Sequence, residues 1–211
     1  MALLRKALRP GDQEAKRSDR RRRVAKSPCP PFPEIERILI TEKQIARRVR
    51  QLTRQLQTDF AGRDLVIVSL LNGTIMFLAD LVRHLSLPLR LDFIGVSSYG
   101  AGTESGELVF TKQLRLDVRG RDVLVVDDIL DTGKTLKRVL AVLREHQPRR
   151  VKVCVLLEKK ARRVEKVRAN YVGFQIPDLF VVGYGLDYAE CYRNLPFVGV
   201  LNPTAYVCDR E

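Results

Sequence analysis

The sequence predicts an α/β protein in which helices flank a mainly parallel β-sheet. Apolar runs of strand length occur at residues 65–71, 123–126 and 151–157, and they are typical of strands covered on both faces. Amphipathic helical segments and glycine-bearing turns separate these runs. Strands that alternate with helices indicate βαβ units and hence a parallel sheet. The chain has 211 residues, 45% of them hydrophobic, which corresponds to one folded domain with some length to spare.

The spare length lies at the amino end, where positive charge is also concentrated. The chain holds 38 Lys and Arg against 25 Asp and Glu, a formal net charge of +13. Residues 1–33 hold ten of the basic and three of the acidic side chains, so they carry over half of the excess. The same stretch contains a proline cluster, so we expect a basic, disordered extension before a folded domain at 34–211. Such an arm either attaches the protein to nucleic acid or an acidic partner, or it is a solvated extension without a role.

Several classes of protein do not fit this sequence. The longest apolar runs fall far short of the roughly 20 residues that span a bilayer, so we expect no transmembrane segment. The amino end lacks the apolar core of a secretory signal, and Asp12, Glu14 and Asp19 argue against a transit peptide. Four widely spaced cysteines and two histidines suggest neither a zinc site nor a disulfide framework. We therefore expect a cytoplasmic protein.

The first expected element after the extension is a helix with a strong start signal. Thr41 and Gln44 have the spacing of a capping box. Apolar residues then recur at helical spacing from 45 to 60, and Gly62 follows as a stop.

The next elements follow in the order strand, helix, strand. The apolar strand at 65–71 leads to a turn at Asn72-Gly73, and Thr74 can cap a second helix. Residues 89–96 have the composition of a strand. Residues 97–107 are rich in Ser, Gly and Thr, so we expect a mobile loop there.

The carboxyl half repeats the alternation. We expect a buried strand at 122–128, a helix from about 132 to 146 and a further buried strand at 151–157. Shorter extended segments are expected at 171–176 and 180–184. In such sheets ligands bind beyond the carboxyl ends of the strands, so functional residues are expected there.

Three carboxylates follow the apolar run at 123–126 within five residues. Asp127 and Asp128 come directly after its apolar run, and Asp131 precedes Thr132, Gly133, Lys134 and Thr135 at an expected helix start. Free N–H groups and hydroxyls at a helix start suit a phosphate monoester, and Gly133 permits close approach of the backbone. Crowded carboxylates require hydroxyl donors or a cation as partners. A ribose diol with Mg²⁺ meets both needs.

The ending Gly133-Lys134-Thr135 also resembles that of a nucleotide-binding P-loop. Asp128 stands where the first glycine of that motif belongs, so the motif is incomplete and ATP hydrolysis is not supported.

The sequence resembles a known family, the type I phosphoribosyltransferases, and within that family it resembles the hypoxanthine-guanine branch. Residues 124–136, Leu-Val-Val-Asp-Asp-Ile-Leu-Asp-Thr-Gly-Lys-Thr-Leu, are similar to the family's phosphoribosyl pyrophosphate signature. Four more segments match in the family's order. Residues 70–81 resemble the pyrophosphate loop and the helix that follows it, and residues 92–99 resemble the start of the flexible active-site loop. Residues 156–159 and 177–193 resemble the two parts of the purine pocket. The resemblance covers about residues 35–205 and implies that a small purine-binding hood accompanies the sheet.

The resemblance implies transfer of ribose 5-phosphate from phosphoribosyl pyrophosphate to N9 of a 6-oxopurine, giving IMP or GMP and pyrophosphate in purine salvage. It implies that Asp127 and Asp128 hold the ribose hydroxyls and that the loop from Asp131 to Thr135 holds the 5-phosphate. Asp131 takes or shares the proton at purine N7 as the general base. Mg²⁺ neutralises the leaving pyrophosphate, with Asp187 as a contact beside Asp127 and Asp128.

The resemblance also implies how the base and the pyrophosphate are held. Lys159 donates to purine O6, Phe180 stacks on the ring, and the Val181 backbone with Asp187 meets the 2-position edge. Around the pyrophosphate it implies roles for a wider set: Leu71, Asn72, Gly73, Ser98, Tyr99 and Arg193. It further implies a homodimer or homotetramer. Many members of the branch have Lys at the position of Asn72, so any role of Asn72 is expected to fall mainly to its backbone.

Each of these residues also has a plainer interpretation. Taken singly, Lys159 could be a solvated charge, Phe180 a core residue, and Ser98 and Tyr99 ordinary loop residues. Only the three aspartates stand out without help from the family.

Two other functions are also compatible with the sequence. One is a regulator that keeps the phosphoribosyl pyrophosphate site but binds RNA or DNA, which the run Arg20–Arg23 permits. The other is a related enzyme that uses xanthine or a pyrimidine as acceptor; the pocket at 180–187 disfavours a pyrimidine.

Overall fold

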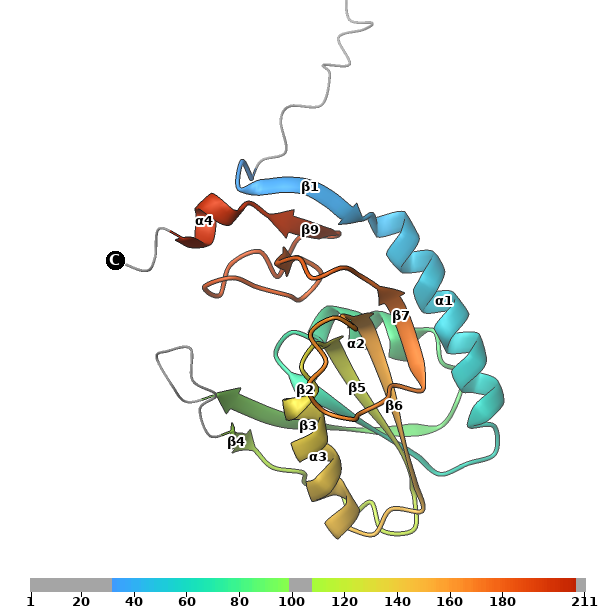
Figure 1. Ribbon diagram of the computed structural model, residues 1–211. Helices are drawn as coiled ribbons and strands as arrows, with labels where there is room; N and C mark the ends of the chain where they lie inside the picture. Colours follow the sequence, from blue (N-terminus) through green and yellow to red (C-terminus); the bar gives the residue numbers. More distant parts are fainter. Residues whose placement is uncertain (1–31, 99–107, 208–211) are drawn as a thin grey trace, which may run out of the picture. The chain divides into compact units, whose positions relative to one another are not determined.

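The computed structural model describes residues 32–98 and 108–207. The chain divides into two units, residues 1–33 and 34–211, and the second contains all of the helices and strands described below. Its main sheet has six strands in the order β4-β3-β2-β5-β6-β7 (Figure 1). Their bounds are Leu108–Lys112 (β4), Leu89–Ser98 (β3), Leu65–Leu71 (β2), Asp122–Leu130 (β5), Arg150–Glu158 (β6) and Tyr171–Gln175 (β7). All neighbours pair in parallel except β3 and β4, which confirms the expected α/β class.

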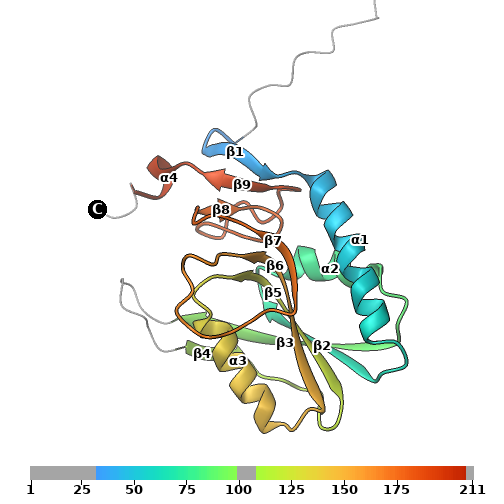
Figure 2. The same cartoon turned by 45° about the vertical axis from the view of Figure 1, so that its right-hand side comes forward.

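Helices cover both faces of this sheet because its central strands are apolar on both sides. Leu65, Ile67, Leu124 and Val126 pack with the helices α1 (Glu42–Asp59) and α2 (Ile75–Arg83). The alternate residues Val66, Val68, Val123 and Val125 pack with α3 (Lys134–Glu145) on the other face (Figure 2). Alternation of side chains along a strand thus divides one apolar run between two hydrophobic cores.

The start of α1 is capped as predicted, whereas the cap of α2 and the first residue of α3 differ from the prediction. Thr41 and Gln44 form the predicted capping box, with Gln44 N–H donating to Thr41 Oγ1 at 3.4 Å. Thr74 occupies the N-cap of α2, but its side chain does not cap that helix; its hydroxyl contacts Leu70 O and Ser69 Oγ instead. α3 begins at Lys134 rather than near Thr132, because Gly133 has a left-handed conformation that the helix cannot include.

A second, antiparallel sheet forms the hood implied by the family. It has the order β1-β9-β8, with β1 at Ile35–Ile40, β9 at Val198–Leu201 and β8 at Val181–Val182 (Figure 1). A short helix, α4 (Pro203–Val207), follows β9. No separate signal in the sequence predicts β1, β4, β9 or α4, because segments of four to six residues are too short for a clear periodicity.

The prediction of a mobile loop at 97–107 is wrong for its first two residues. Ser97 and Ser98 belong to β3, where they pair with β4. The rest of that loop, including Tyr99, lies outside the described residues.

Two features bear on the excluded classes. No helix in the described part of the chain is long and apolar enough to cross a membrane. Cys154 is buried and Cys191 is exposed, and both are free thiols. Burial raises the pKa of the Cys154 thiol to about 12.

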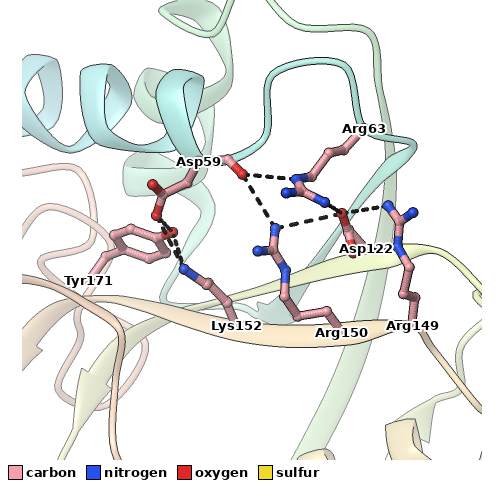
Figure 3. A network of polar contacts seen from close by, with 7 residues as sticks. All are labelled: Asp59, Arg63, Asp122, Arg149, Arg150, Lys152 and Tyr171. Atoms are coloured by element: carbon pink, nitrogen blue, oxygen red, sulfur yellow. Dashed lines mark hydrogen bonds and ion pairs between the residues drawn. The ribbon is translucent and has the colours of Figure 1, made fainter.

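A network of charges joins the amino ends of β5, β6 and β7 to the end of α1 (Figure 3). Asp122, at the start of β5, receives hydrogen bonds from Arg149 at 3.0 and 2.7 Å and has Arg63 and Arg150 within 3.6 Å. The Asp122 side chain is 1% exposed. Burial raises its pKa, but the hydrogen bond from Arg149 and the charges of Arg150, Arg149 and Arg63 outweigh burial and lower the pKa from 3.8. The network therefore stabilises the end of the sheet that lies away from the ligand-binding edge.

Substitution of Asp122 should test this network. We expect Asp122→Asn to lower the free energy of unfolding by about 2 to 3 kcal/mol at pH 7, because three arginines lose their buried counter-ion. Since the folded pKa is depressed, the wild-type advantage should be full above 3.8 and should disappear as the pH falls below it. Urea unfolding at pH 7 and at pH 3 measures both effects.

Asp64→Asn is the matched control. Asp64 pairs with Arg90 and Arg121, but its side chain is 52% exposed, so we expect a loss below about 1 kcal/mol. Equal losses for the two variants would contradict a special role for Asp122.

Candidate active site

The three predicted aspartates meet at the carboxyl end of β5. Asp127 and Asp128 are the sixth and seventh residues of this strand, and Asp127 is in register with Val155 of β6. Asp131 follows the strand's last residue, Leu130. All three line one cavity of about 240 Å³, whose wall is completed by residues from the ends of β2, β3 and β5 and from the start of α3: Leu70, Leu71, Val96, Ile129, Leu130, Thr132, Gly133, Thr135 and Leu136. The structure thus brings the predicted ribose and phosphate residues into one pocket, except Lys134, which does not line it.

The two adjacent carboxylates are electrostatically costly. Burial raises the pKa of Asp127 well above 3.8, and the charge of Asp128 raises it further. Burial also raises the pKa of Asp128, although a hydrogen bond with Asp127 and the charge of Arg193 offset part of that rise. Their hydrogen bonds from protein are local: Asp128 N–H donates to Asp127 Oδ1 at 3.0 Å, and Ile129 N–H donates to Asp128 Oδ1 at 2.7 Å. A ligand that brings hydroxyl donors or a cation would lower this cost.

The loop from Asp131 to Thr135 turns sharply into α3. Gly133 has φ of +84°, and a side chain there would contact Arg163 and Glu165 at 3.3 Å. Val164 N–H and Glu165 N–H both donate to Thr132 O at 3.0 Å, which supports the loop from behind. Lys134 opens α3 with an exposed side chain, and the N–H groups in the first turn of a helix have no partner within the helix, which suits an anion.

The predicted pyrophosphate loop lies against this carboxylate pair. The peptide bond Leu71-Asn72 is cis. A side chain on Gly73 would lie 1.7 Å from Asp128 Oδ2, and one on Gly185 would lie 2.0 Å from Gly73 O. Glycine is therefore required at both positions for the loop to fit between Asp128 and the segment at 183–185. The Asn72 side chain is exposed.

The predicted purine residues come from the end of β6 and from the hood. Lys159 is buried, its N–H donates to Leu130 O at 3.0 Å, and its ammonium lies 3.7 Å from Asp178. The interpretation of Lys159 as a solvated charge is therefore wrong, because only 7% of its side chain is exposed. Phe180 is 41% exposed and packs edge-on against Tyr188 at 5.7 Å, so it is not a core residue. Val181 is buried in β8.

Asp187 and Arg193 pair with one another rather than with the carboxylates of β5. Arg193 Nη1 lies 2.9 Å from Asp187 Oδ1 and donates to Gly185 O at 2.9 Å. Its Nη2 donates to Glu190 at 3.0 Å. Of the two residues predicted from the flexible active-site loop, Ser98 ends β3, and Tyr99 lies outside the described residues, so the structure does not place it against the site.

Comparison with known proteins now identifies the family. A model of the phosphoribosyl transferase domain matches residues 37–189. The chain is 42% identical over 174 residues to hypoxanthine-guanine phosphoribosyltransferase of Bacillus subtilis, covering 82% of this chain and 97% of the relative. The chain belongs to the hypoxanthine-guanine branch of the phosphoribosyltransferase family. It is also 45% identical over 174 residues, 82% of this chain, to the bifunctional protein TilS/HprT of Listeria monocytogenes, and this match spans 27% of that longer relative.

Solved structures lead to the same family. A hypoxanthine phosphoribosyltransferase from Staphylococcus aureus matches with a TM-score of 0.81 and 42% identity, covering 86% of this chain and 99% of that one. A Trypanosoma cruzi hypoxanthine phosphoribosyltransferase in a ternary substrates complex matches with a TM-score of 0.78 and 39% identity, covering 83% and 100%. The type I phosphoribosyltransferase fold expected from the sequence is thereby confirmed.

The donor set of this phosphoribosyltransferase fits Mg²⁺ that is held partly by substrate. Within residues 32–98 and 108–207, no three His, Cys, Asp or Glu side chains gather into a metal site. Asp127, Asp128 and Asp187 therefore do not form a ready cage. Mg²⁺ commonly binds through one or two carboxylates plus substrate phosphates and waters, which suits crowded carboxylates beside a phosphate loop.

Sequence reasoning missed the arginine that supports the site. Arg163 has no predicted role, yet its side chain is 19% exposed and its guanidinium donates to Asp131 O at 3.0 Å and Val167 O at 2.7 Å. It also donates to the buried Glu158 at 3.2 Å. The only signal in the sequence was a run of basic residues, which does not distinguish a buried clamp from a solvated face.

The cost of the paired carboxylates can be measured. A raised carboxyl pKa means that ionisation at neutral pH opposes folding, so we expect Asp127→Asn to raise the free energy of unfolding at pH 7 by about 1 to 2 kcal/mol. The amide keeps the oxygen that accepts from Asp128 N–H. The gain should shrink as the pH falls toward 3.8 and the wild-type pair becomes protonated. Urea unfolding across pH 4–8 is the measurement. If Asp127→Asn were less stable than the wild type at pH 7, the claim that the two adjacent carboxylates destabilise the fold would be contradicted.

Proposed function

We propose that this phosphoribosyltransferase transfers ribose 5-phosphate from phosphoribosyl pyrophosphate to N9 of hypoxanthine or guanine. The products are IMP or GMP and pyrophosphate, and the reaction belongs to purine salvage. The observation that carries the proposal is the Asp131 carboxylate. Its Oδ1 is buried without a hydrogen-bond partner among the described residues, and Asp131 lines the same pocket as the phosphate loop. A buried acceptor without a partner suits an atom reserved for a donor on a ligand.

The carboxyl end of β5 would bind the sugar phosphate. Asp127 and Asp128 would accept hydrogen bonds from the ribose 2- and 3-hydroxyls, which supplies the donors that their crowding requires. Thr132, Gly133, Lys134 and Thr135 would hold the 5-phosphate through backbone N–H groups and hydroxyls.

Asp131 would act as the general base. As N9 attacks the anomeric carbon, the purine N7–H becomes more acidic, and Asp131 Oδ1 would accept or share that proton. Positive charge develops on the ribose as pyrophosphate leaves, and the three carboxylates would stabilise it.

Lys159 would select 6-oxopurines. An ammonium only donates hydrogen bonds, so it pairs with the O6 acceptor of hypoxanthine or guanine but not with the amino group of adenine. The burial of Lys159 supports this role, because a charge held away from water needs a polar partner. Phe180 would stack on the ring, while the Val181 backbone and Asp187 would meet the 2-position edge.

Mg²⁺ would be held by pyrophosphate together with Asp187, with Asp127 and Asp128 nearby, and it supplies charge neutralisation to the leaving group. Arg193 and the loop at Leu71, Asn72 and Gly73 would contact the pyrophosphate. Ser98 and Tyr99 would close over the site and exclude water.

Three further points belong to the proposal. The protein would act in the cytoplasm as a homodimer or homotetramer. Residues 1–33 would be a disordered extension whose basic charge serves at most as a weak nucleic-acid contact. The basic balance of residues 34–211 suits a substrate that carries a phosphate and a pyrophosphate.

A product assay tests the proposed reaction. We expect nucleotide from phosphoribosyl pyrophosphate, Mg²⁺ and hypoxanthine or guanine, little from xanthine, and none from adenine or uracil, with all turnover lost on chelation of Mg²⁺. Chromatographic detection of the nucleotide is the measurement. If no base gave a nucleotide, the result would instead favour a regulator that binds phosphoribosyl pyrophosphate and nucleic acid.

Substitution of Asp131 tests the base role. We expect Asp131→Asn to lower kcat by about 100- to 10,000-fold, because the amide cannot accept the proton from N7. Binding of phosphoribosyl pyrophosphate, measured by calorimetry, should survive. The matched control is Asp117→Asn on the exposed loop before β5, which should retain full turnover. Unchanged turnover in Asp131→Asn would remove Asp131 from the base role.

A further inference from the structure

A chain of alternating charges joins the two groups proposed to touch the purine. Arg162, in the loop after β6, lies with Nη1 3.5 Å from Asp131 Oδ2 and with Nε 3.8 Å from Asp178 Oδ1. The same Asp178 oxygen lies 3.7 Å from the ammonium of Lys159. The order is therefore carboxylate, guanidinium, carboxylate, ammonium, with Asp131 and Lys159 at the two ends.

The contact with Arg162 makes the two oxygens of Asp131 different. Oδ2 faces the guanidinium, whereas Oδ1 is buried and has no hydrogen-bond partner within the described ranges. Leaving a buried acceptor unpaired costs roughly 1 to 3 kcal/mol, so rotation of the carboxylate toward other donors would be favoured if nothing held it. The ion pair with Arg162 holds Oδ2 and so leaves Oδ1 available.

The geometry of the ligand explains why such a chain is needed. In a 6-oxopurine, O6 and N7 lie next to each other on one edge of the ring system. A base for N7 and a donor for O6 must therefore stand close together with opposite charges, and such groups attract one another. No ion pair within 4.0 Å joins Asp131 to Lys159 in the part of the chain that the structure describes, since each has a different partner.

We propose that Arg162 is a positioning residue that, through Asp178, keeps Asp131 and Lys159 apart and aimed at purine N7 and O6. This role rests on the proposed function. Arg162 itself touches neither reacting atom: it orients the base through Oδ2, and Asp178 holds the ammonium of Lys159 at the other end of the chain.

A purely structural role predicts a different result. The side chains of Arg162 and Asp178 are 51% and 49% exposed, and ion pairs this exposed contribute less than about 1 kcal/mol to stability. If the pair served only the fold, its loss would change little. An effect on hypoxanthine use without an effect on folding therefore separates the two roles.

The test compares Arg162→Gln, Arg162→Lys and the control Lys160→Gln, which removes a charge from an exposed neighbour. We expect Arg162→Gln to lower kcat/KM for hypoxanthine by about 10- to 100-fold through misplacement of the base. The KM for phosphoribosyl pyrophosphate should stay within twofold of the wild-type value. The midpoint of urea unfolding should equal that of the wild type within error. Arg162→Lys should recover most of the loss, and Lys160→Gln should match the wild type.

A double-mutant cycle tests the chain itself. If Arg162 and Asp178 act as one unit, Arg162→Gln with Asp178→Asn should lose no more than the larger single loss, rather than the product of the two. Three results would overturn the proposal. The first is a kcat/KM for hypoxanthine that is the same in Arg162→Gln as in Lys160→Gln, and the second is a KM for phosphoribosyl pyrophosphate that rises as much as kcat/KM for hypoxanthine falls. The third is a double mutant whose loss of kcat/KM equals the product of the two single losses. A wild-type protein that makes no nucleotide from any purine would instead refute the proposed function, so the two failures are distinguishable.

Discussion

Two carboxylates lie side by side at the end of a strand whose apolar side chains are packed into two hydrophobic cores, and the rest of the site is arranged around them. Asp127 and Asp128 cannot both ionise cheaply at this depth. The glycine loop at Gly73 fits only because it has no side chain to meet Asp128. Gly185 fits against Gly73 for the same reason, so the hood segment is placed by a chain of close backbone contacts that begins at this pair.

The two ends of the sheet divide stability from function. At the amino ends, Asp122 is surrounded by three arginines, and Arg48 donates from α1 to Val172 O and Gly173 O of β7 at 2.7 and 2.8 Å. At the carboxyl ends, like charges are adjacent and Asp131 Oδ1 has no hydrogen-bond partner among the described residues. Asp122 lies among counter-charges where no ligand is expected, whereas no salt bridge reaches Asp127 or Asp128 within the described residues, which is the pattern of a binding site held by a stable scaffold.

Much of this could be predicted from local pattern. The capping box at Thr41, the buried strands and the three aspartates after β5 follow from periodicity and residue type, because each signal lies within a few residues of chain. The roles of Thr74 and Arg163 could not be predicted in this way. Thr74 has the sequence of a helix cap, but Ser69 and Leu70 O compete for its hydroxyl. Arg163 resembles its solvated neighbours until the loop after β6 folds back over Leu130 and Asp131.

The sequence by itself determined the fold class, the family and the position of the carboxylates at a strand end, since these depend on apolar alternation and on motifs within single segments. Only the tertiary structure decided which charges are buried and which are paired. Lys159, Arg162, Asp178 and Asp131 come from three segments that meet beyond β5 and β6. The free energy of a charge depends on the solvent and counter-charges around it, and those are set by contacts between segments that are distant along the chain.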